Sequence, residues 1–99
     1  MKIIRLFCAG GLSTGLLVKN MIQASEEMGF QADISAHGIG SLDTRGHEAD
    51  IILLGPQIRY KLATAKELYP EKPVFVIEPK MYGMLDGKAV IQEIMKVLK

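Results

Sequence analysis

The sequence of 99 residues has little of several features that specialised proteins need. It contains one cysteine, no tryptophan, three phenylalanines and three tyrosines, so no aromatic platform for stacked bases is expected. Twelve basic and eleven acidic residues give a net charge of +1, which argues against nucleic acid or an anionic membrane as a partner. No apolar run approaches the roughly 20 residues that span a bilayer. The opening MKIIRLFC is too short for a signal peptide.

The single cysteine, Cys8, cannot form an internal disulfide, and with no secretion signal the reducing cytosol is the expected compartment. The only histidines, His37 and His47, do not have the spacing of a metal site, and there is no second cysteine to join them. We therefore expect no metal and no cofactor. With 48% hydrophobic residues, residues 1–99 are expected to form one domain around one core.

Four segments have the patterns of strands. Residues 2–8 (KIIRLFC) form a nearly continuous apolar run, which is typical of a strand covered on both faces, and residues 50–55 and 73–78 read in the same way. Residues 31–37 (QADISAH) instead alternate between apolar and polar side chains. This alternation predicts a half-exposed strand at the edge of a sheet.

Helical patterns separate these strands. Ser13 is a candidate N-cap of a first helix, and Gly29 suits its C-terminal cap. Its apolar stripe consists of Leu17, Met21, Ala24 and Met28. Residues 38–49 are expected to hold a short helical turn. A third helix should begin at Pro56 and end before Pro70. Its inward residues are expected to be Ile58, Leu62, Ala65 and Leu68. Asp86 can cap the last helix, whose inward residues are expected to be Val90, Ile91, Ile94, Met95 and Leu98.

Strands that alternate with helices predict parallel pairing with right-handed crossovers, and hence a three-layer α/β sandwich. If the alternating second strand lies at the edge, the strand order is 2-1-3-4, a small flavodoxin-like arrangement. In open sheets of this kind, ligands bind beyond the carboxyl ends of the strands. Cys8 lies at such an end.

The residues after Cys8 are small or hydroxylated, with one exception. They are Ala9, Gly10, Gly11, Leu12, Ser13 and Thr14. Glycines let backbone approach a ligand closely, and N–H groups above a helix N-terminus form a nest for an anion. The same field favours a thiolate over a thiol. A thiolate beside amides that bind a phosphoryl group can hold that group on sulfur, with the Ser13 and Thr14 hydroxyls as further donors.

Two other phosphate-binding patterns fit less well. Gly10 and Gly15 have the spacing of a Walker A loop, but Leu16 and Leu17 replace its Lys-Ser/Thr, which argues against nucleotide hydrolysis. The cysteine phosphatase loop, C-x-x-x-x-x-R, would need arginine where this chain has Thr14. Without a guanidinium to clamp the transition state, the site should bind phosphate but hydrolyse phosphoesters poorly. This combination is typical of a phosphoryl carrier.

These residues resemble a known family, the enzyme IIB domains of the bacterial sugar phosphotransferase system (PTS), lactose/cellobiose class. The main motif is LFCAGGLSTGLLV (6–18), and three further blocks agree in order and spacing across nearly the whole chain. They are ADIILLGPQIRYKL (49–62), KPVFVIE (72–78) and YGMLDGKAV (82–90). One local departure is Ala9, where family members often have serine.

The resemblance implies a cytoplasmic carrier, peripherally associated with a membrane transporter. A IIA partner carries phosphohistidine, Cys8 accepts its phosphoryl group, and a β-linked disaccharide bound by the IIC transporter receives it. The sugar is expected to be of the cellobiose, lactose or chitobiose type, and the chain to act as a protein-phosphocysteine–sugar phosphotransferase. The family is similar in fold to low-molecular-weight tyrosine phosphatases. Two alternatives remain: a partner-independent phosphatase or arsenate reductase, and a non-catalytic regulatory binding module.

Six residues outside the loop also need an interpretation. We expect His37 to be a solvated turn residue, Gln57 to cap its turn rather than wall the site, and Asp86 to cap a helix rather than act as a general acid. Tyr82 follows the fourth strand at the same end as Cys8, with no role assigned. Met81 and Met84, with Leu12 nearby, are expected to form an apolar rim for partner proteins.

Overall fold

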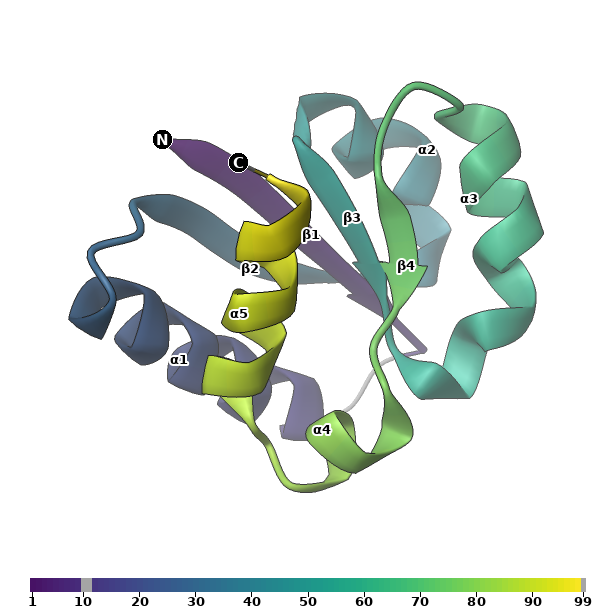
Figure 1. Ribbon diagram of the computed structural model, residues 1–99. Coiled ribbons are helices and arrows are strands. Elements are labelled where there is room, and N and C mark those ends of the chain that lie inside the picture. Colours follow the sequence, from purple (N-terminus) through teal and green to yellow (C-terminus); the bar gives the residue numbers. More distant parts are fainter. Residues whose placement is uncertain (10–11, 99) are drawn as a thin grey trace.

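The structure is a computed structural model that describes residues 1–9 and 12–98. Its four strands form one sheet, and helices cover both faces of this sheet (Figure 1). The strands are β1 (Lys2–Cys8), β2 (Ala32–Gly38), β3 (Ile51–Leu54) and β4 (Val74–Val76). Their order is β2-β1-β3-β4, and every neighbouring pair is parallel. The predicted order 2-1-3-4 is confirmed.

Two long helices cover one face and shorter ones the other, which confirms the three layers. The first face carries α1 (Leu12–Glu27) and α5 (Gly87–Val97), which pack against each other. The second face carries α2 (Leu42–Arg45) and α3 (Leu62–Leu68). Short 3₁₀ turns flank these two helices: η1 (Ile39–Ser41), η2 (Gly46–Glu48) and η3 (Pro56–Lys61). A further helix, α4 (Pro79–Gly83), follows β4.

The first face is filled by aliphatic side chains. Ile4 and Leu6 of β1 meet Leu17 and Met21 of α1 there with no exposed surface, as a strand covered on both faces requires. The apolar side of β2 packs against the same cluster, whereas Asp33 on its other side is exposed. The predicted edge strand is therefore confirmed.

The second face corrects the predicted third helix. Residues from Pro56 to Lys61 form a 3₁₀ segment interrupted at Ile58, and a regular α-helix begins only at Leu62. The prediction that Leu68 is buried is wrong, because it is 46% exposed while Tyr69 is buried in the second cluster. The 3₁₀ segment has about three residues per turn, fewer than an α-helix, and this shifts the positions that face the core in the helix after it. As a result Tyr69, with its larger side chain, packs into the second cluster in place of Leu68.

The region after β3 and β4 also differs from the prediction. Hydrogen-bonded β4 is shorter than the predicted 73–78, although Ile77 remains buried and its N–H still donates to Leu54 at 2.8 Å. The helix α4 was not predicted. Its signal was Pro79, which occupies the first turn, where a missing N–H costs nothing.

Candidate functional site

Cys8 is the last residue of β1, a central strand, and lies at the carboxyl edge of the sheet. It is 5% exposed and pairs in register with Gly38 of β2. Its sulfur lies 4.0 Å from the carbonyl oxygen of His37, to which the thiol donates a long, weak hydrogen bond. Such a contact costs little to break when the sulfur turns towards another group.

The end of β3 passes close beside the cysteine. The N–H of Gly55 donates to the carbonyl of Phe7 at 2.8 Å. A Cβ atom at Gly55 would lie 3.5 Å from Cβ of Cys8 and only 2.9 Å from Oε1 of Gln57. Glycine at this position therefore allows the Gln57 carboxamide to lie over the strand end next to Cys8. No side-chain hydrogen bond caps η3, so the expectation that Gln57 caps its turn is wrong.

The first helix begins very close to the cysteine. Only three residues, Ala9 to Gly11, join β1 to α1, so the Cα atoms of Cys8 and Leu12 lie at most about 14 Å apart. Ala9 is exposed. The first turn of α1 contains no acidic side chain, so nothing within it neutralises the positive end of the helix dipole. The chain therefore places the N-terminal turn of α1, with no acidic side chain in it, shortly after the cysteine.

The predicted phosphate-binding residues are only partly covered by the structure. Gly10 and Gly11 lie outside the described residues, as do the side chains of Leu12 and Ser13. Since α1 begins at Leu12, Ser13 is its second residue and not the N-cap that we expected. Thr14 is 2% exposed, and its hydroxyl lies 2.7 Å from that of Tyr82.

The remaining sequence predictions have mixed outcomes. Asp86 caps α5, because its Oδ1 accepts from the N–H of Ala89 at 3.1 Å, as predicted. His37 is not in a turn: it belongs to β2, and its Nε2 is bonded to Oγ of Ser35 at 2.8 Å. Burial, followed by the positive charges of Arg45 and Arg5, lowers the pKa of His37 below 6.5.

The exposure expected for the methionine rim is found at one of its two methionines, and docking at this rim stays a prediction. Met84 is 68% exposed, whereas Met81 is half-buried against the first-face cluster. Exposed Tyr60 in η3 and exposed Leu16 in α1 also belong to elements that meet at this edge of the sheet, and sequence reasoning missed both. The available signal was that Leu16 lies off the apolar stripe of its helix, at a position where a polar residue is expected.

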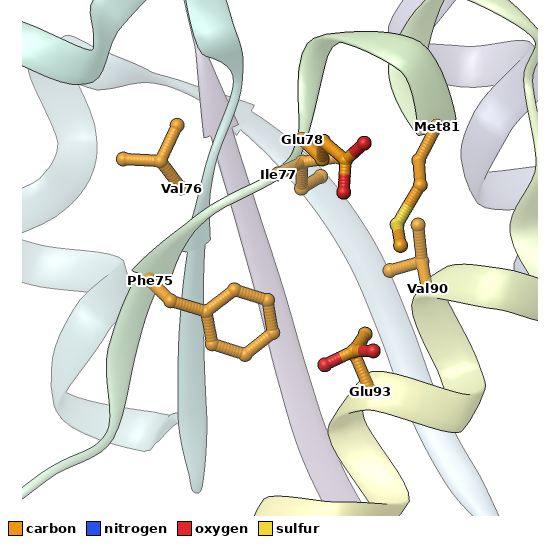
Figure 2. A pocket seen from close by; sticks show the side chains of 7 residues that line it. All are labelled: Phe75, Val76, Ile77, Glu78, Met81, Val90 and Glu93. Atoms are coloured by element: carbon orange, nitrogen blue, oxygen red, sulfur yellow. The ribbon is translucent and has the colours of Figure 1, made fainter.

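A pocket of about 190 Å³ lies elsewhere, between the edge strand β4 and α5. Figure 2 shows Phe75 and Val90 among its walls and the carboxylates of Glu78 and Glu93 at its border. Neither Cys8 nor the described residues of its loop line this cavity. Among the described residues, no three His, Cys, Asp or Glu side chains gather to hold a metal ion. The candidate site is therefore the open edge around Cys8.

Within residues 1–9 and 12–98, none of the helices has both the length and the hydropathy that crossing a membrane requires.

Known proteins resemble the chain over nearly its whole length. The family described as "PTS system, Lactose/Cellobiose specific IIB subunit" matches residues 3–93. The oligo-beta-mannoside-specific EIIB component of Bacillus subtilis is 33% identical, with 99% of this chain and 97% of the relative covered. The galactose-specific EIIB component of Lactococcus lactis subsp. cremoris is 36% identical, with 91% and 90% covered. The cellobiose-specific EIIB component of Lactococcus lactis subsp. lactis is 35% identical, with the same coverage.

Solved structures agree with the observed fold. The lactose-specific IIB domain of Streptococcus pneumoniae superposes with a TM-score of 0.81 at 17% identity, covering 96% of this chain and 95% of that one. The cellobiose-specific IIB protein of Borrelia burgdorferi gives a TM-score of 0.74 at 29% identity, covering 92% and 85%. Together with the match over residues 3–93, these likenesses show that the chain belongs to the lactose/cellobiose-specific IIB family of the sugar phosphotransferase system, whose members are phosphoryl carriers and work with IIA and IIC partners.

Proposed function

We propose that Cys8 is the residue that carries the phosphoryl group. The observation that carries this proposal is the position of Cys8: it ends a central strand, and only three residues separate it from an N-terminal helix turn that contains no acidic side chain. Cysteine is also the strongest nucleophile among the side chains at this edge, and the chain has only one. A thiolate here can attack phosphorus while main-chain N–H groups bind the phosphoryl oxygens.

The proposed donor is phosphohistidine on a IIA partner. In the first transfer, the S–P bond forms as the N–P bond of phosphohistidine breaks, and the proton lost by the thiol is balanced by one taken up by the leaving imidazole. In the second, the S–P bond breaks as a sugar hydroxyl oxygen bonds to phosphorus, and the hydroxyl proton is balanced by reprotonation of sulfur. Residues Ala9 to Thr14 are the proposed cradle for the phosphoryl group in both steps.

The acceptor is proposed to be a β-linked disaccharide bound by a IIC transporter at the cytoplasmic face of the membrane. Two of the relatives are specific for cellobiose and for oligo-beta-mannosides, which are β-linked, and a third is specific for galactose. Uptake of a panel of disaccharides in cells with and without the chain tests this part. Uptake of a β-linked disaccharide that depends on the chain supports it, and dependence for monosaccharides alone contradicts it.

Partner docking is proposed at an apolar rim around the carboxyl edge, made of Leu16, Tyr60 and Met84. All three are exposed, and they come from α1, η3 and the end of α4, which meet at this edge. Basic Arg59 lies beside Tyr60 in sequence and is also exposed. Large exposed apolar side chains with a polar border are typical of a protein interaction surface.

The test of the carrier role is phosphotransfer from a phosphorylated IIA subunit. The wild-type chain should gain the mass of one phosphoryl group, and peptide mapping should place it on Cys8. The Cys8→Ser and Cys8→Ala variants should gain none. A label on another residue, or an equal label on the Cys8→Ala variant, would contradict the proposal.

A further inference from the structure

Two buried hydroxyl groups meet behind the proposed cradle. The hydroxyls of Thr14 and Tyr82 lie 2.7 Å apart although the residues are 68 positions apart in sequence, and Tyr82 is only 9% exposed. We propose that Tyr82 is a positioning residue for phosphoryl transfer: its O–H donates to Oγ1 of Thr14, which leaves the Thr14 hydrogen to donate to the phosphoryl group. This inference rests on the proposed function, because it assigns Thr14 to the cradle.

Either hydroxyl can donate in the bond between them. With a phosphoryl group bound, donation by Tyr82 pairs both hydrogens, because the Thr14 hydrogen is then free to donate to a phosphoryl oxygen. If Thr14 donated to Tyr82 instead, the Tyr82 hydrogen would need another acceptor, and the other buried members of the first-face cluster, to which Tyr82 belongs, have aliphatic or sulfur-containing side chains that offer none. Hydroxyls bonded in series also polarise one another, which makes Thr14 a stronger donor.

The position of the Tyr82 hydroxyl is fixed by the segment that follows it. The carbonyl of Leu85, a residue with φ of 52°, accepts from Nδ2 of Asn20 in α1 at 2.9 Å. At Gly87 the chain approaches α1 so closely that a Cβ would lie 2.4 Å from the backbone carbon of Asn20 and the backbone nitrogen of Met21. Residues 82–87 therefore hold α1 at three points, and the Tyr82 contact is the one nearest the cradle.

The other side of α4 is anchored as well. Figure 2 shows Met81, the neighbour of Tyr82, directed towards Val90 of α5, and Met81 packs against the first-face cluster. Because α4 is held from both sides, its tyrosine hydroxyl can define where the first turn of α1 lies. A fixed donor placed in advance of reaction is what phosphoryl transfer requires.

The chain provides a matched control on the second face. Tyr69 is 3% exposed, and its hydroxyl donates to the carbonyl of Leu42 at 2.7 Å. Tyr69→Phe thus removes a buried hydroxyl and one hydrogen bond, as Tyr82→Phe does, but it does not contact Thr14. Any difference in phosphotransfer between the two variants reports the Thr14 contact rather than the loss of a buried hydroxyl.

The experiment measures the rate of phosphotransfer from phosphorylated IIA and the KM for this donor in folded variants. Tyr82→Phe should lower the maximal rate about tenfold, a change of about 1.4 kcal/mol in the barrier, with KM unchanged. Tyr69→Phe should leave both unchanged. In a Thr14→Val background, Tyr82→Phe should add no further loss, because it acts through Thr14. Equal rates in Tyr82→Phe and Tyr69→Phe, or additive losses in the double variant, would overturn the inference.

The wild-type chain separates this inference from the function on which it rests. If wild type is not phosphorylated at Cys8, both fail; if it is, and Tyr82→Phe transfers normally, only the inference fails. Should Tyr82→Phe unfold at the assay temperature, NMR of the wild type decides. Phosphorylation should shift the ring resonances of Tyr82 and leave those of Tyr69 in place, and an unchanged Tyr82 would contradict the proposal.

Discussion

Both faces of the sheet have an apolar core. On the face covered by α1 and α5 apolar packing dominates, whereas on the face covered by α2 and α3 long charged side chains also link the sheet to the segments that cover it. Arg5 of β1 bonds there to the carboxylate of Glu48 and, at 3.3 Å, to that of Asp33. The ammonium of Lys72 is bonded to the carbonyls of Gly46, His47 and Ala49 at 2.9, 2.6 and 2.9 Å.

The difference follows from the lengths of the helices. Sixteen-residue α1 and eleven-residue α5 present long apolar stripes, so burial alone can hold them. The four-residue α2 and its flanking turns bury little and leave many carbonyls unpaired, which side-chain donors satisfy. Among the described side chains of the first face, the buried polar residues are Thr14 and Ser25, and the Ser25 hydroxyl bonds within its own helix. Thr14, the buried polar residue of this face that bonds to a distant part of the chain, thus belongs to the proposed site.

The largest effect is expected where the first face is packed most tightly. Gly87→Ala places a methyl group 2.4 Å from the backbone of α1, so α5 must move, at a cost of about 3 kcal/mol in the free energy of unfolding. Gly83→Ala is the control, because a Cβ there meets nothing within 4 Å. Urea unfolding of both variants measures the difference. Equal stability would mean that the first face does not depend on close helix packing.

A smaller effect is expected from the polar contacts of the second face. Lys72→Met keeps most of the aliphatic length but leaves three carbonyls without their donor, and we expect a loss of about 2 kcal/mol in the free energy of unfolding. Phosphotransfer at a temperature where the variant is folded should be unchanged. Unchanged stability would contradict the view that this face depends on polar contacts, and a slower transfer would link it to the site.

A still smaller effect is expected at the proposed docking rim, which joins the two faces. Tyr60→Ser removes a largely exposed apolar side chain and should raise the KM for phosphorylated IIA about fivefold, with the maximal rate unchanged. Leu68→Ser is the matched control, because Leu68 is also exposed but ends α3 on the side that leads into β4. Similar KM values in both variants would exclude Tyr60 from the interface.

The smallest effect is a selective weakening of the second face in acid. A hydrogen bond from Arg5, together with the charges of Arg5 and Arg45, holds the pKa of Glu48 below 4.5, so its contribution to stability is present above that pH and is lost as the pH falls through the folded value. The lowered pKa of His37 means that the unfolded chain binds its proton more readily, so stability starts to fall below about pH 6.5. Both groups therefore destabilise the fold as the pH falls.

Thermal melting between about pH 7.5 and 4 measures how stability falls with pH, and amide hydrogen exchange shows which face opens first. The loss of stability that begins below about pH 6.5 should disappear in the His37→Gln variant. As the pH falls, amide exchange should rise in residues 39–49 before it rises in α5. A variant that loses as much stability as wild type between pH 7 and 5.5 would remove His37 from the account. Amide exchange that rises equally on both faces as the pH falls would contradict the proposed difference in acid stability between them.

The sequence predicted most of the fold and the centre of the proposed site because both depend on local patterns. The apolar run ending at Cys8 predicts a buried strand, and the alternation around Ile34 predicts the edge, which together determine the strand order. Contacts between distant residues could not be predicted in this way. Nothing in the spacing shows that Tyr82 meets Thr14, or that Tyr69 rather than Leu68 is buried, because each depends on how whole helices pack.

The most direct test of the central claim, that Cys8 carries the phosphoryl group, is a ³¹P NMR spectrum of the chain after incubation with phosphorylated IIA. The account predicts one resonance with the chemical shift of a phosphorus–sulfur bond, which is absent from the Cys8→Ser variant. A resonance of a phosphorus–nitrogen bond, which would place the group on His37 or His47, would contradict it.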